Sequence, residues 1–362
     1  MLTRLLAIIA LLSAVNLRAD DTIIFRIRLQ PRLDFGDITR RPERSDYKSE
    51  ADMYLRRVRL EIVGKPTDRI LYIAAFSADR WNQKGRDDQV TLGYAFMDYR
   101  FSERLRLHLG LSKLPYSKSA LTSSSRQLLI ERPAVVDLGT RLFNYFVPHI
   151  MLHGKLAQGK LAYNFTVMDG LQAGDLDRAF SRKEVVESGD PGFVGRIEFS
   201  PAGWIEARKS ESHLGRGRHL GLGLNSAFQS GIGLADIGEE RRFLLGADLS
   251  FHLESISLQT EYMYMERDGT TRIEPSGWYV QGGYYIKRFR LEPAARFGRV
   301  DGDRNRDDDQ TRIFSGGVNC YLRGHDLKIQ ANIFRQSFDK NAREVANRDA
   351  KTGFRLQGQM YF

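Results

Sequence analysis

The feature that most constrains this chain is an alternation of apolar and polar residues with a period of two. In the first such segment, Phe25, Ile27 and Leu29 alternate with Arg26 and Arg28. Successive side chains of a β-strand point to opposite faces, so this pattern predicts a strand with one apolar and one charged face. The alternation recurs at 105–111, 245–252, 327–333 and 354–362. Because no segment shows a convincing helical stripe, we predict an all-β protein.

Composition narrows the class of all-β protein. Charged residues make up 28% of the 362 residues, which excludes a bundle of apolar membrane-spanning helices. A membrane β-barrel remains possible because its strands need only one apolar face. The single cysteine, Cys320, excludes an intramolecular disulfide.

The amino terminus has the layout of a secretory signal peptide. A basic start including Arg4 precedes an apolar run from Leu5 to Val15, and Ala19 is followed by acidic residues. We expect residues 1–19 to be a signal peptide and residues 20–362 to form one outer-membrane β-barrel domain.

The connections between the alternating segments also alternate in length, as in outer-membrane barrels. We expect short turns on one rim near 65–69, 102–104, 157–160, 200–203, 253–255, 287–289 and 323–326. Longer polar connections fall at 36–51, 81–89, 112–147, 170–191, 230–240, 266–276, 301–310 and 340–350. This division predicts about 16 strands, although residues 206–218 fit either a turn or an additional hairpin.

The chain ends on an alternating strand whose last residue is Phe362. This ending looks like the signal for assembly into the outer membrane of a Gram-negative bacterium. Closure of the sheet would pair the first strand with the last, leaving no edge exposed to hydrocarbon.

A barrel of this size encloses an aqueous channel. Parity of the strands places many basic residues on the lumen face: Arg26, Arg28, Arg32, Arg57, Arg59, Arg100, Arg106, Arg196, Arg290, Arg296, Lys328 and Arg355. Acidic residues on the same face include Asp34, Glu61, Asp98, Glu198, Asp248, Glu261 and Glu292. One interpretation is a wall of ion pairs. The other, which the surplus of arginine on the first two strands favours, is a pore that selects anions.

The sequence gives little support for a catalytic, nucleotide-binding or metal-binding site. We find no nucleophile elbow, phosphate-binding loop or paired-histidine helix motif. His149 and His153 would lie about 13 Å apart on a strand, too far to share a metal ion. The acidic segment 301–312 lacks the glycine and the bidentate acid of a calcium loop. We therefore expect no enzyme activity, no cofactor, no metal and no nucleic-acid partner.

Several short motifs, in order, resemble the phosphate-selective porins O and P. They are Arg28-Leu29-Gln30 with Asp34-Phe35-Gly36, Leu55-Arg56-Arg57-Val58-Arg59-Leu60-Glu61, Leu121-Thr122-Ser123-Ser124-Ser125, Ile130-Glu131-Arg132 and Met151-Leu152-His153-Gly154-Lys155-Leu156. The resemblance is clearest over residues 25–170 and returns in the closing strand.

This resemblance implies a homotrimer of 16-stranded channels in which the third loop folds into the lumen and narrows it. Carried over by motif, the constriction arginines would be Arg28, Arg56 and Arg57. Parity, however, places Arg56 on the outer face unless it lies near the rim or a bulge shifts the register. We expect Arg26, Arg32, Arg59 and Arg106 to line the pore as well. The constriction loop would present Ser123, Ser124, Ser125, Arg126 and Arg132. Arg126 stands where a family member carries a lysine after the serines. Because of this difference, we expect broad anion selectivity and not a preference for phosphate alone.

The expected partners are inorganic anions, phosphate among them, and outer-membrane lipid. Two alternatives stay open. A sleeve or scaffold for a partner protein would need no ion conductance. A barrel enzyme would need an oriented Ser-His pair, and parity turns His108 and His252 inward with no third residue to orient them.

Overall fold

The computed structural model describes residues 22–37, 51–83, 88–173, 176–177, 184–235, 238–346 and 349–362. The expected signal peptide lies outside this part of the chain. Within it, none of the helices is long and apolar enough to cross a bilayer.

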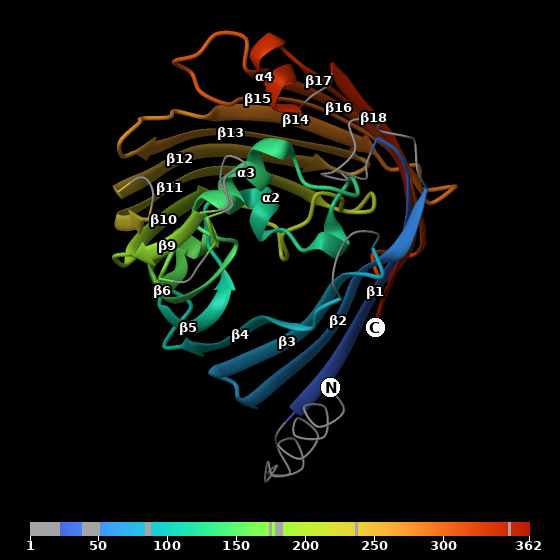
Figure 1. Cartoon of the computed structure of the whole chain (residues 1–362). Helices are drawn as coiled ribbons and strands as arrows, with labels where there is room; N and C mark the ends of the chain where they lie inside the picture. The colour runs from blue at the N-terminus through green and yellow to red at the C-terminus, as the bar shows by residue number, and fades with distance from the viewer. Residues whose placement is uncertain are drawn as a thin grey trace.

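Sixteen antiparallel strands close into one barrel (Figure 1), as the sequence predicts. They are β1 (Thr22–Gly36), β2 (Asp52–Thr67), β3 (Ile70–Trp81), β4 (Thr91–Arg100), β5 (Arg106–Lys113), β6 (Phe146–Leu156), β7 (Leu161–Met168), β10 (Gly192–Phe199), β11 (Arg218–Leu234), β12 (Gly238–Leu253), β13 (Ile256–Asp268), β14 (Ser276–Tyr284), β15 (Leu291–Asp301), β16 (Gln310–Arg323), β17 (Leu327–Phe338) and β18 (Ala350–Tyr361).

The barrel closes between its first and last strands. β1 pairs with β2 on one side and with β18 on the other, and Phe35 lies opposite Phe354. At the other end of this seam, the amide of Ile27 donates to the carbonyl of Phe362 at 3.0 Å. The predicted pairing of first and last strands is confirmed, and it leaves neither strand with an open edge.

Burial in the strands is the reverse of that in a water-soluble protein. On β17, Ile329 and Ile333 are 45% and 58% exposed, whereas Lys328 is fully buried. The apolar side chains form the outer surface, and the polar ones face inward. This arrangement suits a barrel surrounded by hydrocarbon.

The connection between β5 and β6, residues 114–145, is called the third loop below. It contains α2 (Lys118–Leu121), η1 (Ser124–Arg126) and α3 (Ala134–Leu142). Figure 1 shows α2 and α3 within the ring of strands. Its apolar side chains, including Leu114, Tyr116 and Val136, pack in one buried cluster with residues of the strands. Each such side chain contributes roughly 1.5–3 kcal/mol by leaving water.

Three connections differ from the short turns and long loops that the sequence predicts. The connection between β10 and β11 covers residues 200–217, where the sequence suggested a tight turn at 200–203, and it contains neither a further strand nor a hairpin. Between β7 and β10, the short strands β8 (Leu176–Asp177) and β9 (Glu184–Ser188) pair, and β9 also pairs with β11. The predicted long connection at 230–240 is mostly strand, because a bulge near Gln229 lets β11 continue to Leu234.

The remaining regular elements lie at the two rims. The turn between β6 and β7 contains η2 (Ala157–Gly159), and the connection between β17 and β18 contains α4 (Lys340–Ala346). The rim where β1 begins and β18 ends is called the lower rim below.

Candidate functional site

A β-bulge in β2 brings two adjacent arginines to the lumen. Gln30 of β1 pairs with Arg57, but the next residue, Pro31, pairs with Leu55, so Arg56 has no partner in the register. A bulge redirects the extra residue. Arg56 and Arg57 are accordingly only 8% and 4% exposed. The outward position that parity gives Arg56 is therefore wrong.

Both arginines line a cavity of about 500 Å³ between the third loop and the strands β1 to β6, called the central cavity below. Three carboxylates, Glu61, Asp79 and Asp137, also line it. The basic side chains around it number eight: Arg26, Arg28, Arg56, Arg57, Arg59, Lys113, Arg132 and Arg208. The wall of this cavity therefore carries a surplus of positive charge.

Three of these arginines share one carboxylate. Asp79 lies 2.9 Å from Arg59, 3.7 Å from Arg56 and 3.9 Å from Arg57. Arg56 also lies 3.6 Å from Glu131, so two carboxylates face three guanidinium groups and do not neutralise them. Moreover, the buried Nε atoms of all three have no hydrogen-bond acceptor among the described residues, and an unpaired buried donor favours binding of an acceptor.

Arg28 connects the wall to the third loop. Its guanidinium donates to Ser124 Oγ at 3.1 Å and to Glu61 at 3.2 Å. Glu61 also accepts from the hydroxyls of Tyr94 at 2.5 Å and Tyr361 at 3.2 Å. Arg28 is thus held by an ion pair and still lines the central cavity.

Two further cations near the loop have no carboxylate partner among the contacts of the described residues. Lys113 Nζ donates to the carbonyl of Ala120 at 2.8 Å, and Arg132 donates to that of Thr122 at 3.0 Å. Both also lie over the ring of Tyr145, at 5.4 and 5.3 Å from its centroid. The carbonyl oxygens orient both side chains toward the loop without pairing either of them with an acidic group.

Sequence reasoning missed Lys113. The alternation in β5 places it on the same face as the outward leucines 105–111. Lys113 is the last residue of β5 and pairs with Phe146, the first of β6, where the chain enters and leaves the third loop. The turn of the backbone into the lumen takes the side chain with it, and only the length of the following loop hinted at that turn.

The other expected site residues occupy several levels of the channel. Arg26, Ser123 and Ser124 line the central cavity. Ser125 is buried beside Ser123, whose hydroxyl lies 3.0 Å from its own. Arg126 is partly buried, and burial together with the neighbouring Arg208 lowers its pKa. Arg32 is buried between Gln357 and Glu131. Arg106 lies near the lower rim, 2.9 Å from Glu103.

Polar contacts fix the third loop to the wall as well. Glu261 of β13 accepts from the amide of Ser119 at 2.7 Å. On the opposite side, Asn332 accepts from the amide of Ile130 at 2.7 Å. Because the loop backbone is hydrogen-bonded to the barrel along its length, its position in the lumen is defined.

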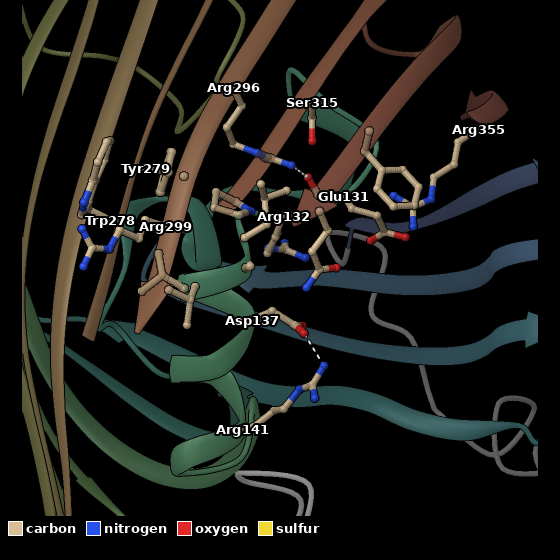
Figure 2. A pocket seen from close by; sticks show the side chains of 18 of the residues that line it. Glu131, Arg132, Asp137, Arg141, Trp278, Tyr279, Arg296, Arg299, Ser315 and Arg355 are labelled. Atoms are coloured by element: carbon tan, nitrogen blue, oxygen red, sulfur yellow. Dashed lines mark hydrogen bonds and ion pairs between the residues drawn. The ribbon is translucent and has the colours of Figure 1, made fainter. Parts of the chain in front are cut away.

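Glu131 of the third loop lines a cavity of about 320 Å³, called the outer cavity below, on the side of the central cavity away from the lower rim. Figure 2 shows Arg296 and Arg355 on either side of Glu131, with Arg132 beside it and Arg141 bonded to Asp137. Burial opposes ionisation of Glu131, but Arg32 and Arg56 hold its pKa well below the usual range. This carboxylate offsets part of the positive charge around it.

The connection 200–217, called the lower connection below, supports the third loop from the lower rim. Lys118 forms a buried ion pair with Glu206. Glu211 accepts from Ser119 Oγ at 2.8 Å and from the amide of Leu128 at 2.9 Å. The two inserted segments therefore form one packed unit.

The same connection lines a lower cavity of about 330 Å³ together with Arg106, His153 and Glu198. Arg208 lines this cavity and the central one, whereas Arg56, Arg57 and Arg132 line the central and the outer one. The three cavities are therefore neighbours along the barrel.

Some basic residues of the lumen face are paired with carboxylates, as the interpretation of the lumen face as a wall of ion pairs predicts. Arg196 donates to Asp248 at 2.9 Å and to Glu198 at 2.8 Å. Arg290 is not on the lumen wall: it lies exposed in the turn between β14 and β15, with a φ of 54°. The turn extends through residue 290, one residue beyond the expected 287–289, and β15 begins only at Leu291.

A serine and an aspartate lie near His108 in the lumen, where the sequence predicts no third residue that orients this histidine. Ser112 Oγ lies 2.9 Å from Nε2 of His108. Asp98 is 3.8 Å from the other ring nitrogen but only 2.5 Å from His153. Because Asp98 bonds to His153 instead, it does not orient His108 as a base for Ser112.

Solved structures share the fold. An anion-selective porin from Comamonas acidovorans has a TM-score of 0.63 with 9% identity, covering 95% of this chain and 100% of that one. The outer membrane channel DcaP of Acinetobacter baumannii has a TM-score of 0.64 with 10% identity, covering 96% and 99%. OmpT of Vibrio cholerae, in its trimer form, has 0.62 with 9% identity, covering 94% and 99%.

Sequence comparison identifies the family. An uncharacterised protein of Aquifex aeolicus (strain VF5) is 34% identical over 93% of this chain and 86% of its own length. The family model for phosphate-selective porin O and P matches residues 25–203 and 225–362. These ranges include the bulged arginine pair, the third loop and the closing strand. The chain therefore belongs to the phosphate-selective porin O and P family.

Proposed function

We propose that this outer-membrane porin forms a water-filled, anion-selective diffusion channel. The observation that carries the proposal is the surplus of eight basic over three acidic side chains around the central cavity. Cationic rings in a pore raise the local concentration of anions and repel cations. An anion-selective porin of the same fold supports the proposal.

The permeation path follows from the shared residues of the cavities. An anion would pass from the outer cavity to the central one beside Arg57 and Arg132, and from the central to the lower one beside Arg208. A row of cations along a path lets an anion move between neighbouring sites without being trapped at one.

Phosphate belongs among the proposed permeants. A guanidinium group presents two parallel donors that match phosphate oxygens, and Arg56 and Arg57 are adjacent on one bulge. Lys113 adds a side-chain amine to the wall of the central cavity beside the third loop. We further propose that the porin assembles as a homotrimer, as the family resemblance implies.

Planar bilayers test the function directly. In a gradient of potassium chloride, we expect a reversal potential that shows chloride preferred over potassium. Added phosphate should reduce the chloride current by competing for the arginines. A cation preference would contradict the proposal. A chloride preference without competition by phosphate would restrict it to anions in general, and a barrel with no conductance would favour the role of a scaffold.

A further inference from the structure

A row of aromatic rings borders the arginines of the central cavity. The ring centroids of Tyr145 and Phe146 are 4.5 Å apart, those of Phe146 and Tyr94 are 6.1 Å apart, and those of Tyr94 and Phe96 are 6.3 Å apart. All four are partly exposed, and all four line the central cavity. This aromatic row runs from the end of the third loop along the lumen wall.

The cations are attached to the same row. Lys113 and Arg132 both lie over the ring of Tyr145. Tyr94 donates to Glu61 at 2.5 Å, and Glu61 in turn binds Arg28. The cavity therefore joins an apolar, ring-bearing side to a cationic side at several points.

A small inorganic anion would use only one of these sides. Its charge would be met by the guanidinium groups, while the rings would offer it nothing but apolar surface. A volume of about 500 Å³ falls within the range of about 300–1,000 Å³ that is usual for sites of organic ligands, which combine aromatic lining with a few placed charges. Flat rings stack favourably on aromatic side chains.

We infer that the central cavity takes organic anions that carry a flat ring, with the ring on the aromatic row and the charged group on the arginines. The inference rests on the proposed anion channel and specifies its substrate class. Tyr145 also donates to the carbonyl of Ala120 at 2.8 Å and so supports the third loop. The side chains of Phe96 and Phe146 have no polar group and make no hydrogen bond to the loop. Substituting these two residues therefore tests ring binding without removing a hydrogen bond that supports the loop.

The test compares phenyl phosphate with methyl phosphate, two monoesters of the same charge, as blockers of chloride current in planar bilayers. For the unmodified porin, we expect half-block by phenyl phosphate at about a fivefold lower concentration, in line with the strength of an aromatic contact. In the Phe96→Leu/Phe146→Leu variant, the two esters should become equal while methyl phosphate blocks as before. Phe146→Leu alone should give an intermediate ratio.

Phe165→Leu is the matched control, because Phe165 is 53% exposed on the outer face, and it should keep the original ratio. Equal half-block concentrations in the unmodified porin would overturn the inference. So would a ratio that persists in the double variant. The reversal potential in chloride is measured first in the same bilayers, so failure of the proposed anion selectivity is seen separately from failure of the ring preference.

Discussion

At the residue scale, the proposed anion selectivity depends on basic side chains that outnumber the carboxylates around the central cavity. Asp79 is shared by three arginines, and Lys113 and Arg132 are held by backbone carbonyls. This arrangement fixes the positions of the cations in the wall while leaving net positive charge for an anion. Fixed charge is more effective than mobile charge because no reorganisation is needed as the ion arrives.

Replacing Lys113 tests one of these charges. Lys113→Gln removes a cation that has no carboxylate partner among the described contacts, and the amide can still donate to a loop carbonyl. We expect single-channel chloride conductance at low salt to fall by about half, and the difference to shrink in concentrated salt because screening weakens the wall potential. Lys340→Gln, at an exposed position on α4, should leave conductance unchanged. Equal conductance of Lys113→Gln and the unmodified porin would show that Lys113 is structural.

Sequence alternation predicts the inward positions of Arg28 and Arg57 because both follow the regular period of two. It fails for Arg56, which the bulge redirects, and for Lys113, which sits where the strand turns into the lumen. Both failures occur where local backbone geometry departs from the regular strand, and neither departure has a distinct sequence signal. The roles of the expected pore residues remain predictions.

At the element scale, the third loop and the lower connection pack against each other. The third loop binds the wall through residues such as Glu261 and Asn332, and it binds the lower connection through Lys118 and Glu211. Loops of this length in a compact domain usually have a function. We infer that the pair of segments sets the width of the channel.

Shortening the third loop tests this role. Deleting residues 121–132 removes Ser123, Ser124 and Arg132 from the central cavity while leaving most of the apolar base of the loop. We expect single-channel conductance to rise and anion preference to weaken. Migration on unheated gels, compared with heated samples, checks that the barrel has formed. An unchanged conductance would mean that the loop lies outside the permeation path.

Acid should loosen the lower connection. Burial opposes ionisation of Glu206, but Lys118 and His213 lower its pKa to about 2. Since this pKa is below that of an unfolded chain, the ionised form stabilises the contact at neutral pH. That contribution is lost as the pH falls from about 4.5 toward 2, and it is on the order of 3 kcal/mol.

We therefore expect open-channel noise to rise between about pH 4.5 and about pH 2. Glu206→Gln should be noisy already at neutral pH and should lack this acid step. A step of the same size in Glu206→Gln would assign it to another group.

The sequence predicts the strands far better than the inserted segments. Each barrel strand has two chemically different faces, and this signal survives without any knowledge of the partner strand. The lower connection and the β8–β9 pair depend on contacts with distant parts of the chain, such as Lys118 with Glu206 and β9 with β11. Their placement is tertiary, so local pattern does not specify it.

At the scale of the whole molecule, the barrel places apolar residues outside and charge inside. Outward residues such as Ile329 meet the membrane, and inward residues such as Lys328 meet the channel or the third loop. Because lumen positions are polar in any case, their charge can change with little cost to the fold. The proposed selectivity therefore depends on the inner face of the strands, whereas the outer face meets the membrane.

The central claim is that arginines of the central cavity make the channel select anions. Arg28 and Arg57 are both buried in its wall, and each lies on a strand of the seam region. Replacing both by Glu changes the local charge by four units while retaining polar side chains in the lumen. The most direct measurement is the reversal potential of Arg28→Glu/Arg57→Glu in a gradient of potassium chloride, beside the unmodified porin. We predict that the anion preference is abolished or inverted in the double variant. A double variant that keeps the chloride preference of the unmodified porin would contradict the account.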